Sequence, residues 1–142
     1  MARIPTTMLV VALAARDAKG RLLLQQRPTG KHHAGLWEFP GGKVELSENP
    51  REALVREIEE ELTCMLDPAV LTPAGFTEGV AGDGVTGIVL LLYTCPDLDA
   101  EIAAREGQEW GWFEEEKAVT LPLAPMDAHL LAGLSAKAIA KP

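Results

Sequence analysis

Apolar residues occur along this chain in short runs that are separated by polar, glycine-bearing segments. The first two runs, residues 7–15 and 21–26, are rich in β-forming side chains. The segment between them, Arg16-Asp-Ala-Lys-Gly20, has the composition of a turn. Two such runs joined by a turn predict a β-hairpin.

Two later runs, residues 69–79 and 85–95, flank the turn sequence Ala81-Gly-Asp-Gly84 and predict a second antiparallel strand pair. Shorter strands are predicted at 36–39, where Pro40-Gly41-Gly42 ends the strand, and at 109–113.

Two segments have helical periodicity. The first is residues 50–62, where Ser47, Asn49 and Pro50 provide a start signal, and the second is 126–140. Strands, a helix, more strands and a final helix indicate an α+β fold. We expect an α/β/α sandwich in which a mixed β-sheet is flanked by helices.

Composition limits the class of protein. The 142 residues, 15.3 kDa in mass, suit one domain spanning 1–142, and a content of 47% hydrophobic and 24% charged residues excludes a mostly disordered chain. The net charge of −8 argues against binding to duplex nucleic acid. It does not exclude an anionic small molecule, because a divalent metal can invert the local field.

Cellular location is predicted from what the sequence lacks. Cys64 and Cys95 are far apart in the chain and suggest two free thiols in a reducing cytoplasm. No apolar run has the length of about 18 residues that a membrane span needs, so we expect no membrane partner. Residues 8–15 have the outline of a signal peptide, but we interpret them as a buried strand because they continue into the predicted hairpin.

The helix at 50–62 carries most of the candidate chemistry. At about 100° per residue, Glu57, Glu60 and Glu61 share an arc of about 100° beside the apolar stripe. Like charges at this spacing repel. One interpretation is a solvated, charged helix face. The other is a site for magnesium or manganese, which prefer oxygen ligands and are commonly shared with substrate phosphates.

The same helix completes a longer motif. Gly42 is followed after five residues by Glu48, and after seven more by Arg56-Glu-Ile-Glu-Glu-Glu61. This spacing resembles the Nudix box, the 23-residue signature of the Nudix hydrolases. One position departs from the family pattern, because Thr63 stands where the family has a glycine that ends the helix in a left-handed conformation. We therefore expect a different or strained helix end, with no catalytic group lost.

The resemblance covers nearly the whole chain. Trp37-Glu-Phe-Pro-Gly-Gly42 is similar to the approach to the box in MutT-type members, Glu106-Gly-Gln108 to their late acidic loop, and Leu121–Asp127 to bacterial pyrimidine nucleoside triphosphate pyrophosphohydrolases. The resemblance implies that the substrate is a nucleoside triphosphate, either an ordinary one or an oxidised or modified one, and that the products are the monophosphate and pyrophosphate. It also implies magnesium or manganese as cofactor.

The resemblance also implies a role for each site residue. Glu60 and Glu61 are metal ligands, Glu57 is a ligand or the general base, and the carbonyl of Gly41 is a further ligand. Arg56 orients Glu57 or its neighbours, unless it is only part of a surface ion pair. Glu106 supplies a ligand or the base, unless it is a solvated loop acid.

The remaining candidates would contact the nucleotide. Arg27 and His32 are phosphate contacts or simply exposed, and Glu38 and Phe39 lie at the nucleoside end, although Phe39 suits a core position equally well. Asp127 either accepts a hydrogen bond from an exocyclic amine of the base or is an acid favoured by the helix dipole.

Two alternative functions stay open. The first is a Nudix hydrolase for another nucleoside diphosphate derivative, such as ADP-ribose, a sugar nucleotide or a dinucleoside polyphosphate. The second is a non-catalytic module that senses a nucleotide. The sequence predicts neither the preferred base nor the oligomeric state.

Overall fold

The computed structural model describes residues 7–28, 30 and 33–140, and its strands form two sheets. The four-stranded sheet has the order β4 (Gly41–Lys43), β1 (Thr7–Ala15), β6 (Gly87–Cys95) and β5 (Thr72–Val80). β1 and β6 are parallel and the other neighbours antiparallel, so this sheet is mixed. The antiparallel three-stranded sheet has the order β3 (Trp37–Glu38), β2 (Leu22–Gln26) and β7 (Trp110–Phe113).

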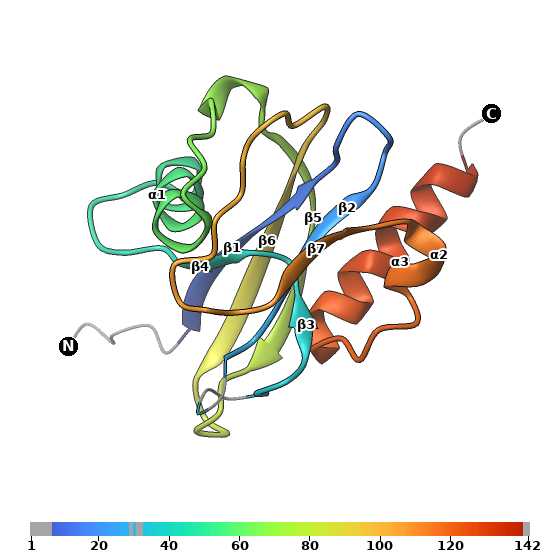
Figure 1. The fold of residues 1–142 in the computed structure, drawn as a ribbon. Coiled ribbons are helices and arrows are strands. Elements are labelled where there is room, and N and C mark those ends of the chain that lie inside the picture. Colours follow the sequence, from blue (N-terminus) through green and yellow to red (C-terminus); the bar gives the residue numbers. More distant parts are fainter. Residues whose placement is uncertain (1–6, 29, 31–32, 141–142) are drawn as a thin grey trace.

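Helices cover both sides of the sheets (Figure 1). α1 (Pro50–Leu62) lies on one side, and α3 (Pro125–Ala140) and the short α2 (Glu115–Ala118) lie on the other. The predicted α+β sandwich with a mixed sheet is confirmed. In the part of the chain that the structure describes, no helix combines the length and the apolar character needed to cross a membrane.

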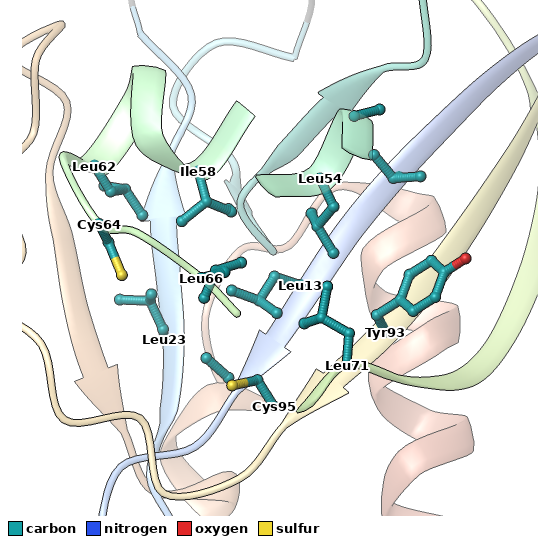
Figure 2. Packing of buried hydrophobic residues seen from close by; sticks show 13 residues of the cluster. Leu13, Leu23, Leu54, Ile58, Leu62, Cys64, Leu66, Leu71, Tyr93 and Cys95 are labelled. Carbon is teal, nitrogen blue, oxygen red and sulfur yellow. The ribbon is translucent and has the colours of Figure 1, made fainter. Parts of the chain in front are cut away.

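β1 runs through the centre of the molecule, and its alternate residues point into two apolar clusters. Val11 and Leu13 belong to the cluster beneath α1, and Ala12 and Ala14 to the cluster beneath α3. Figure 2 shows the first cluster, in which the apolar stripe of α1 faces the sheet. Burial on both faces explains why β1 reads as a continuous apolar run.

α1 begins where the sequence predicts. The Asn49 side chain accepts a hydrogen bond from the Glu52 N–H, the Glu52 carboxylate accepts one from the Asn49 N–H, and Pro50 is the first helical residue. This reciprocal pair satisfies two N–H groups that a helix start otherwise leaves unpaired.

The end of α1 shows which conformation Thr63 adopts in place of the family glycine. Thr63 adopts the left-handed conformation, with φ 57° and ψ 31°, and its N–H donates to the Glu59 carbonyl. The helix therefore ends as a glycine would end it, at a cost of about 1–2 kcal/mol for a residue with a Cβ atom. The Thr63 hydroxyl donates to the Ala103 carbonyl and accepts from Arg105 Nε, each at 3.0 Å.

Several boundaries differ from the prediction. The predicted first hairpin is wrong, because β1 and β2 belong to different sheets. A turn connects them, and a single isolated bridge, Arg16–Leu22, pairs the chain on its two sides. β5 starts later than predicted because Pro68–Val70 forms a 3-10 turn, η1. The sequence did not predict α2, and α3 starts one residue early, at Pro125.

β4 was also missed, because its two glycines resemble a strand break. A Cβ atom on Gly41 would lie 1.9 Å from the Val11 carbonyl oxygen. Glycine is therefore needed for the close approach of β4 to β1, and it marks a strand rather than ending one.

Candidate active site

A cavity of about 930 Å³ opens beside β1, β4 and α1. Its size is typical of small-molecule sites. Eight of the predicted site residues line it: Arg27, Glu38, Phe39, Gly41, Glu57, Glu61, Glu106 and Asp127. Arg56 and Glu60 are described but do not line it, and His32 lies outside the described residues.

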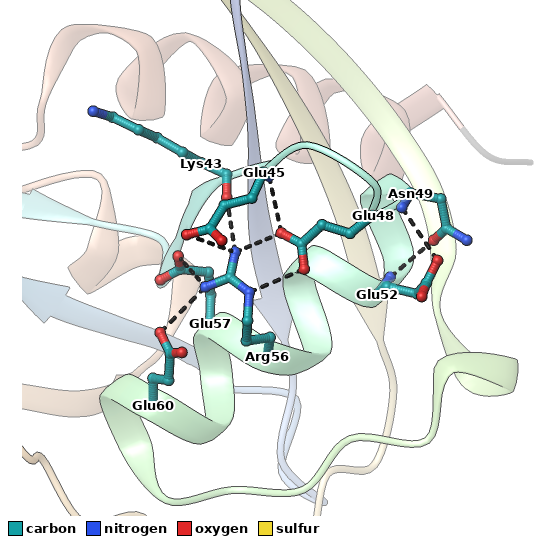
Figure 3. Close-up of polar contacts among 8 residues, drawn as sticks. All are labelled: Lys43, Glu45, Glu48, Asn49, Glu52, Arg56, Glu57 and Glu60. Carbon is teal, nitrogen blue, oxygen red and sulfur yellow. Dashed lines mark hydrogen bonds and ion pairs between the residues drawn. The ribbon is translucent and has the colours of Figure 1, made fainter.

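Arg56 is the centre of an ion-pair cluster that includes Glu57, one of the residues that line the cavity (Figure 3). Its guanidinium donates twice to Glu48, at 2.6 and 3.0 Å, and once each to Glu57 at 2.9 Å and Glu60 at 3.2 Å. It also donates to the Lys43 carbonyl, which ties α1 to the end of β4. We refer to Arg56, Glu48, Glu57 and Glu60 as the Arg56 cluster.

Arg56 stabilises the charged form of Glu48. Its hydrogen bonds lower the pKa of Glu48 to about 2, and Glu48 in turn raises the pKa of Arg56. The planar guanidinium presents several donors at fixed angles, so it also fixes the directions in which Glu57 and Glu60 point.

Glu57 depends on a neighbouring glycine as well. A Cβ atom on Gly42 would lie 2.3–2.6 Å from the three carboxyl atoms of Glu57. The carboxylate therefore occupies the space that any other residue at position 42 would fill. Gly41 therefore allows β4 to approach β1, and Gly42 leaves room for the carboxylate of Glu57.

Glu61 lies deeper in the cavity, where Arg56 does not reach it. Burial raises the pKa of Glu61 to about 8; a hydrogen bond from Gln25 opposes this rise, and the negative charges of Glu38, Glu57 and Glu106 add to it. The Gln25 amide donates to Glu61 Oε2 at 2.5 Å. At neutral pH this carboxyl is thus poorly stabilised as an anion without a further positive charge.

The chemistry of these donors fits a hard cation. Among residues 7–28, 30 and 33–140, no three His, Cys, Asp or Glu side chains are gathered as a metal centre would require. Glu60 is 58% exposed and turned toward Arg56, so the structure does not bring it beside Glu61. The cavity nevertheless holds Glu57, Glu61 and Glu106, whose mutual repulsion a divalent cation would relieve.

Asp127 lines another part of the same cavity. Asp127 lies in the first turn of α3, is only 6% exposed, and accepts a hydrogen bond at Oδ1 from the Phe39 N–H at 2.9 Å. Burial raises the pKa of Asp127 to about 7; the Phe39 N–H opposes the rise and Glu38 adds to it. Its burial and its bond to Phe39 distinguish Asp127 from a surface acid that is favoured only by the helix dipole.

Glu38 is held by two other residues that line the cavity. One carboxylate oxygen accepts from Arg27 at 2.9 Å and the other from the Gln25 amide at 3.1 Å. Burial raises the pKa of Glu38, against the lowering effect of Arg27 and Gln25. Arg27 Nε is buried without a hydrogen-bond partner within the described part of the chain.

Sequence reasoning missed two glutamines at this site. Gln25 and Gln108 are buried, 3% and 8% exposed, and Gln108 donates to the Gln25 carbonyl oxygen at 3.3 Å. The available signal was a polar residue at the end of an otherwise apolar strand. It did not show which acids, distant in the sequence, would face that residue.

Comparison with known proteins identifies the family. The NUDIX domain family matches residues 6–134. The CTP pyrophosphohydrolase of Escherichia coli K12 is 38% identical over 137 residues, covering 95% of this chain and 97% of that protein. An 8-oxo-dGTP diphosphatase of Haemophilus influenzae is 34% identical over 123 residues, covering 86% and 87%.

Solved structures agree with these matches. The solution structure of the E. coli ORF135 protein has a TM-score of 0.83 and 35% identity and covers 99% of both chains. A MutT protein from Methanosarcina mazei, at 21% identity, shares the fold with a TM-score of 0.83 over 96% of this chain and 99% of that one. The chain belongs to the Nudix hydrolase family.

Proposed function

We propose that this protein hydrolyses a nucleoside triphosphate to the nucleoside monophosphate and pyrophosphate, with magnesium as cofactor and manganese as a substitute. The observation that carries the proposal is a single cavity with repelling acids at one end and a buried hydrogen-bond acceptor, Asp127, at the other. The curated relatives, a CTP pyrophosphohydrolase and an 8-oxo-dGTP diphosphatase, act at this type of bond.

The acidic end would receive the phosphates. Glu57, Glu61 and the Gly41 carbonyl are the groups that would hold the metal, and Glu60 would join them by turning away from Arg56. Bound there, the metal would neutralise part of the triphosphate charge and polarise a phosphoryl oxygen. Either Glu57 or Glu106 would take the proton from the attacking water.

Asp127 supports a choice of base. Its Oδ1 is committed to the Phe39 N–H, which leaves Oδ2 to accept a hydrogen bond from the nucleoside. A carboxylate acceptor favours an exocyclic amine, such as the N4 amine of cytosine, over a carbonyl. We therefore propose a substrate whose base carries that amine. The two free, buried thiols support the cytoplasmic location predicted above.

The test is a panel of CTP, UTP, 8-oxo-dGTP and ADP-ribose, with separate assays for pyrophosphate and phosphate. We expect magnesium-dependent release of pyrophosphate, with CTP preferred to UTP, which differs from it at the exocyclic amine. Faster turnover of ADP-ribose would favour the other Nudix substrate classes. Binding of CTP without hydrolysis would favour a nucleotide sensor.

A further inference from the structure

One buried amide lies between two acids that line the cavity. Gln25 lies on β2, opposite Glu38 on β3, and is 3% exposed. Its Nε2 donates to Glu61 Oε2 at 2.5 Å and to Glu38 Oε2 at 3.1 Å, so its two amide hydrogens serve two different carboxylates. These two acids come from different elements, α1 and β3.

The other side of the amide is occupied as well. Gln25 Oε1 accepts from Gln108 Nε2 at 3.3 Å, and Gln108 Oε1 accepts from the Glu106 N–H at 3.0 Å. Gln108 Nε2 also approaches the Glu61 carbonyl at 3.3 Å. The amide therefore links the α1 acid, the β3 acid and the loop that carries Glu106.

The orientation of this amide has no alternative while both acids are ionised. If Gln25 were turned over, its carbonyl oxygen would face two carboxylates and both acids would lose their donor. A buried polar network whose members are all satisfied is rigid, because any rotation leaves a buried group unpaired.

We infer that Gln25 is a positioning residue that fixes Glu61 for metal binding and Glu38 for nucleotide binding through one amide group. The inference rests on the proposed function and extends it: an acid proposed to bind the metal and an acid proposed to bind the nucleotide are held by a shared contact rather than independently. Residues that orient metal ligands typically change metal affinity or activity by about 10–100-fold when they are replaced.

The test compares Gln25→Met with Gln26→Met. Methionine matches glutamine in length but has no amide hydrogen, so Gln25→Met removes both donors with little change in shape. Gln26 is the next residue of the same strand, and its amide donates instead to the Gly35 carbonyl at 2.9 Å. Mn²⁺ binding to the nucleotide-free protein is followed by electron paramagnetic resonance, and the KM for CTP is measured at saturating Mg²⁺.

We expect Gln25→Met to weaken Mn²⁺ binding by about 10-fold or more and to raise KM, and Gln26→Met to leave the Mn²⁺ affinity unchanged. If Gln25→Met does not fold, Gln25→Ala takes its place, because water can enter a polar space of that size and satisfy the two acids without orienting them. The same weakening is expected for that variant.

Wild-type Mn²⁺ affinity and KM in a folded Gln25 variant would overturn the inference and leave the proposed function intact. A change in melting temperature alone, with both binding readouts unchanged, would also overturn it, since Gln25 would then be a structural residue only. If the wild-type protein neither binds Mn²⁺ nor releases pyrophosphate, the proposed function fails, and the inference fails with it.

Discussion

Two groups of acids at this site are held by different means. In the Arg56 cluster, a guanidinium donates hydrogen bonds to Glu48, Glu57 and Glu60. In the buried group, defined here as Glu61, Glu38 and Asp127, amides and a backbone N–H replace most of the positive charge. Among these three acids, the described residues provide an arginine partner for Glu38 only, namely Arg27.

The difference separates two kinds of glutamate, one just before α1 and one on it. The pKa of Glu48 falls to about 2 beside Arg56, whereas burial raises that of Glu61 to about 8. A buried acid held by an amide gains a great deal from a cation, whereas an acid paired with arginine gains less. We therefore expect Glu61 to depend most on the metal, and Arg56 to fix the directions of its partners, Glu57 among them.

The largest effect should come from Glu61→Gln, which keeps the shape of the side chain and removes its charge. We expect pyrophosphate release to fall by roughly 1,000-fold with the fold retained, because a charged group is lost where the reacting phosphates bind. Steady-state kinetics and circular dichroism measure the two properties.

Glu59→Gln is the matched control, since Glu59 lies on the same helix with its side chain exposed. We expect it to retain activity within about twofold, as is usual for an exposed surface change. Equal losses in the two variants would mean that buried and exposed glutamates of α1 do not differ in function, and the comparison would fail.

The next largest effect is on how the free energy of unfolding depends on pH, which should differ between the buried group and the Arg56 cluster. A carboxyl with a raised pKa binds more protons in the folded than in the unfolded state, so the metal-free protein should lose stability as pH rises from about 4.5, the ordinary value for Glu61, to about 8. Asp127 adds to this loss between about 4 and 7. Glu48 acts oppositely, since its contribution is lost only as pH falls toward 2.

Urea denaturation at pH 5 and pH 8, in chelator and in Mg²⁺, measures this difference. We expect a loss of a few kcal/mol between the two pH values in chelator, and recovery of much of it at pH 8 when Mg²⁺ binds the folded state. Glu61→Gln should flatten the slope. A metal-free protein that is more stable at pH 8 than at pH 5 would contradict the raised pKa values.

Asp127→Asn should change the choice of base. Asparagine can keep an oxygen toward the Phe39 N–H, and it then presents an NH₂ group where Asp127 presents an acceptor. We expect the ratio of kcat/KM for CTP to that for UTP to fall about 10–100-fold. An unchanged ratio, measured with both nucleotides on both proteins, would remove Asp127 from base recognition.

The sequence predicts local features of this site better than distant contacts. The start of α1 at Asn49 and Pro50 follows from capping chemistry, and the shared helix face of Glu57 and Glu61 follows from periodicity. Gln25 could not be assigned a role, because its partners lie 13, 36 and 83 residues away and only the folded chain brings them together.

The same distinction applies to the fold. Alternation of β1 residues between two clusters is what a central strand requires, yet a turn follows β1 and favours a hairpin prediction. The pairing with β6, far along the chain, takes the place of that hairpin. Gly41 was misread for a related reason: its need for a close neighbour appears only when β1 is beside it.

The smallest effect concerns the loop that supports the buried group. The Ala103 N–H donates to the Leu62 carbonyl and the Arg105 N–H to the Glu61 carbonyl, both at 3.0 Å, so the loop before β7 caps the end of α1. The Thr63 hydroxyl adds two further bonds to this loop. Thr63→Val keeps the branched shape and removes only the hydroxyl.

We expect Thr63→Val to lower the free energy of unfolding by about 1 kcal/mol, since two hydrogen bonds at an exposed site are lost. Thr63→Gly loses the same bonds but relieves the left-handed conformation, so its effect should stay within about 1 kcal/mol of zero. Denaturant midpoints at equal slope give both values. If Gly costs more than Val, residue 63 is not left-handed in solution. If neither variant loses stability, the hydroxyl does not hold the loop, and its other contacts, which include the two backbone bonds and Gln108, are sufficient.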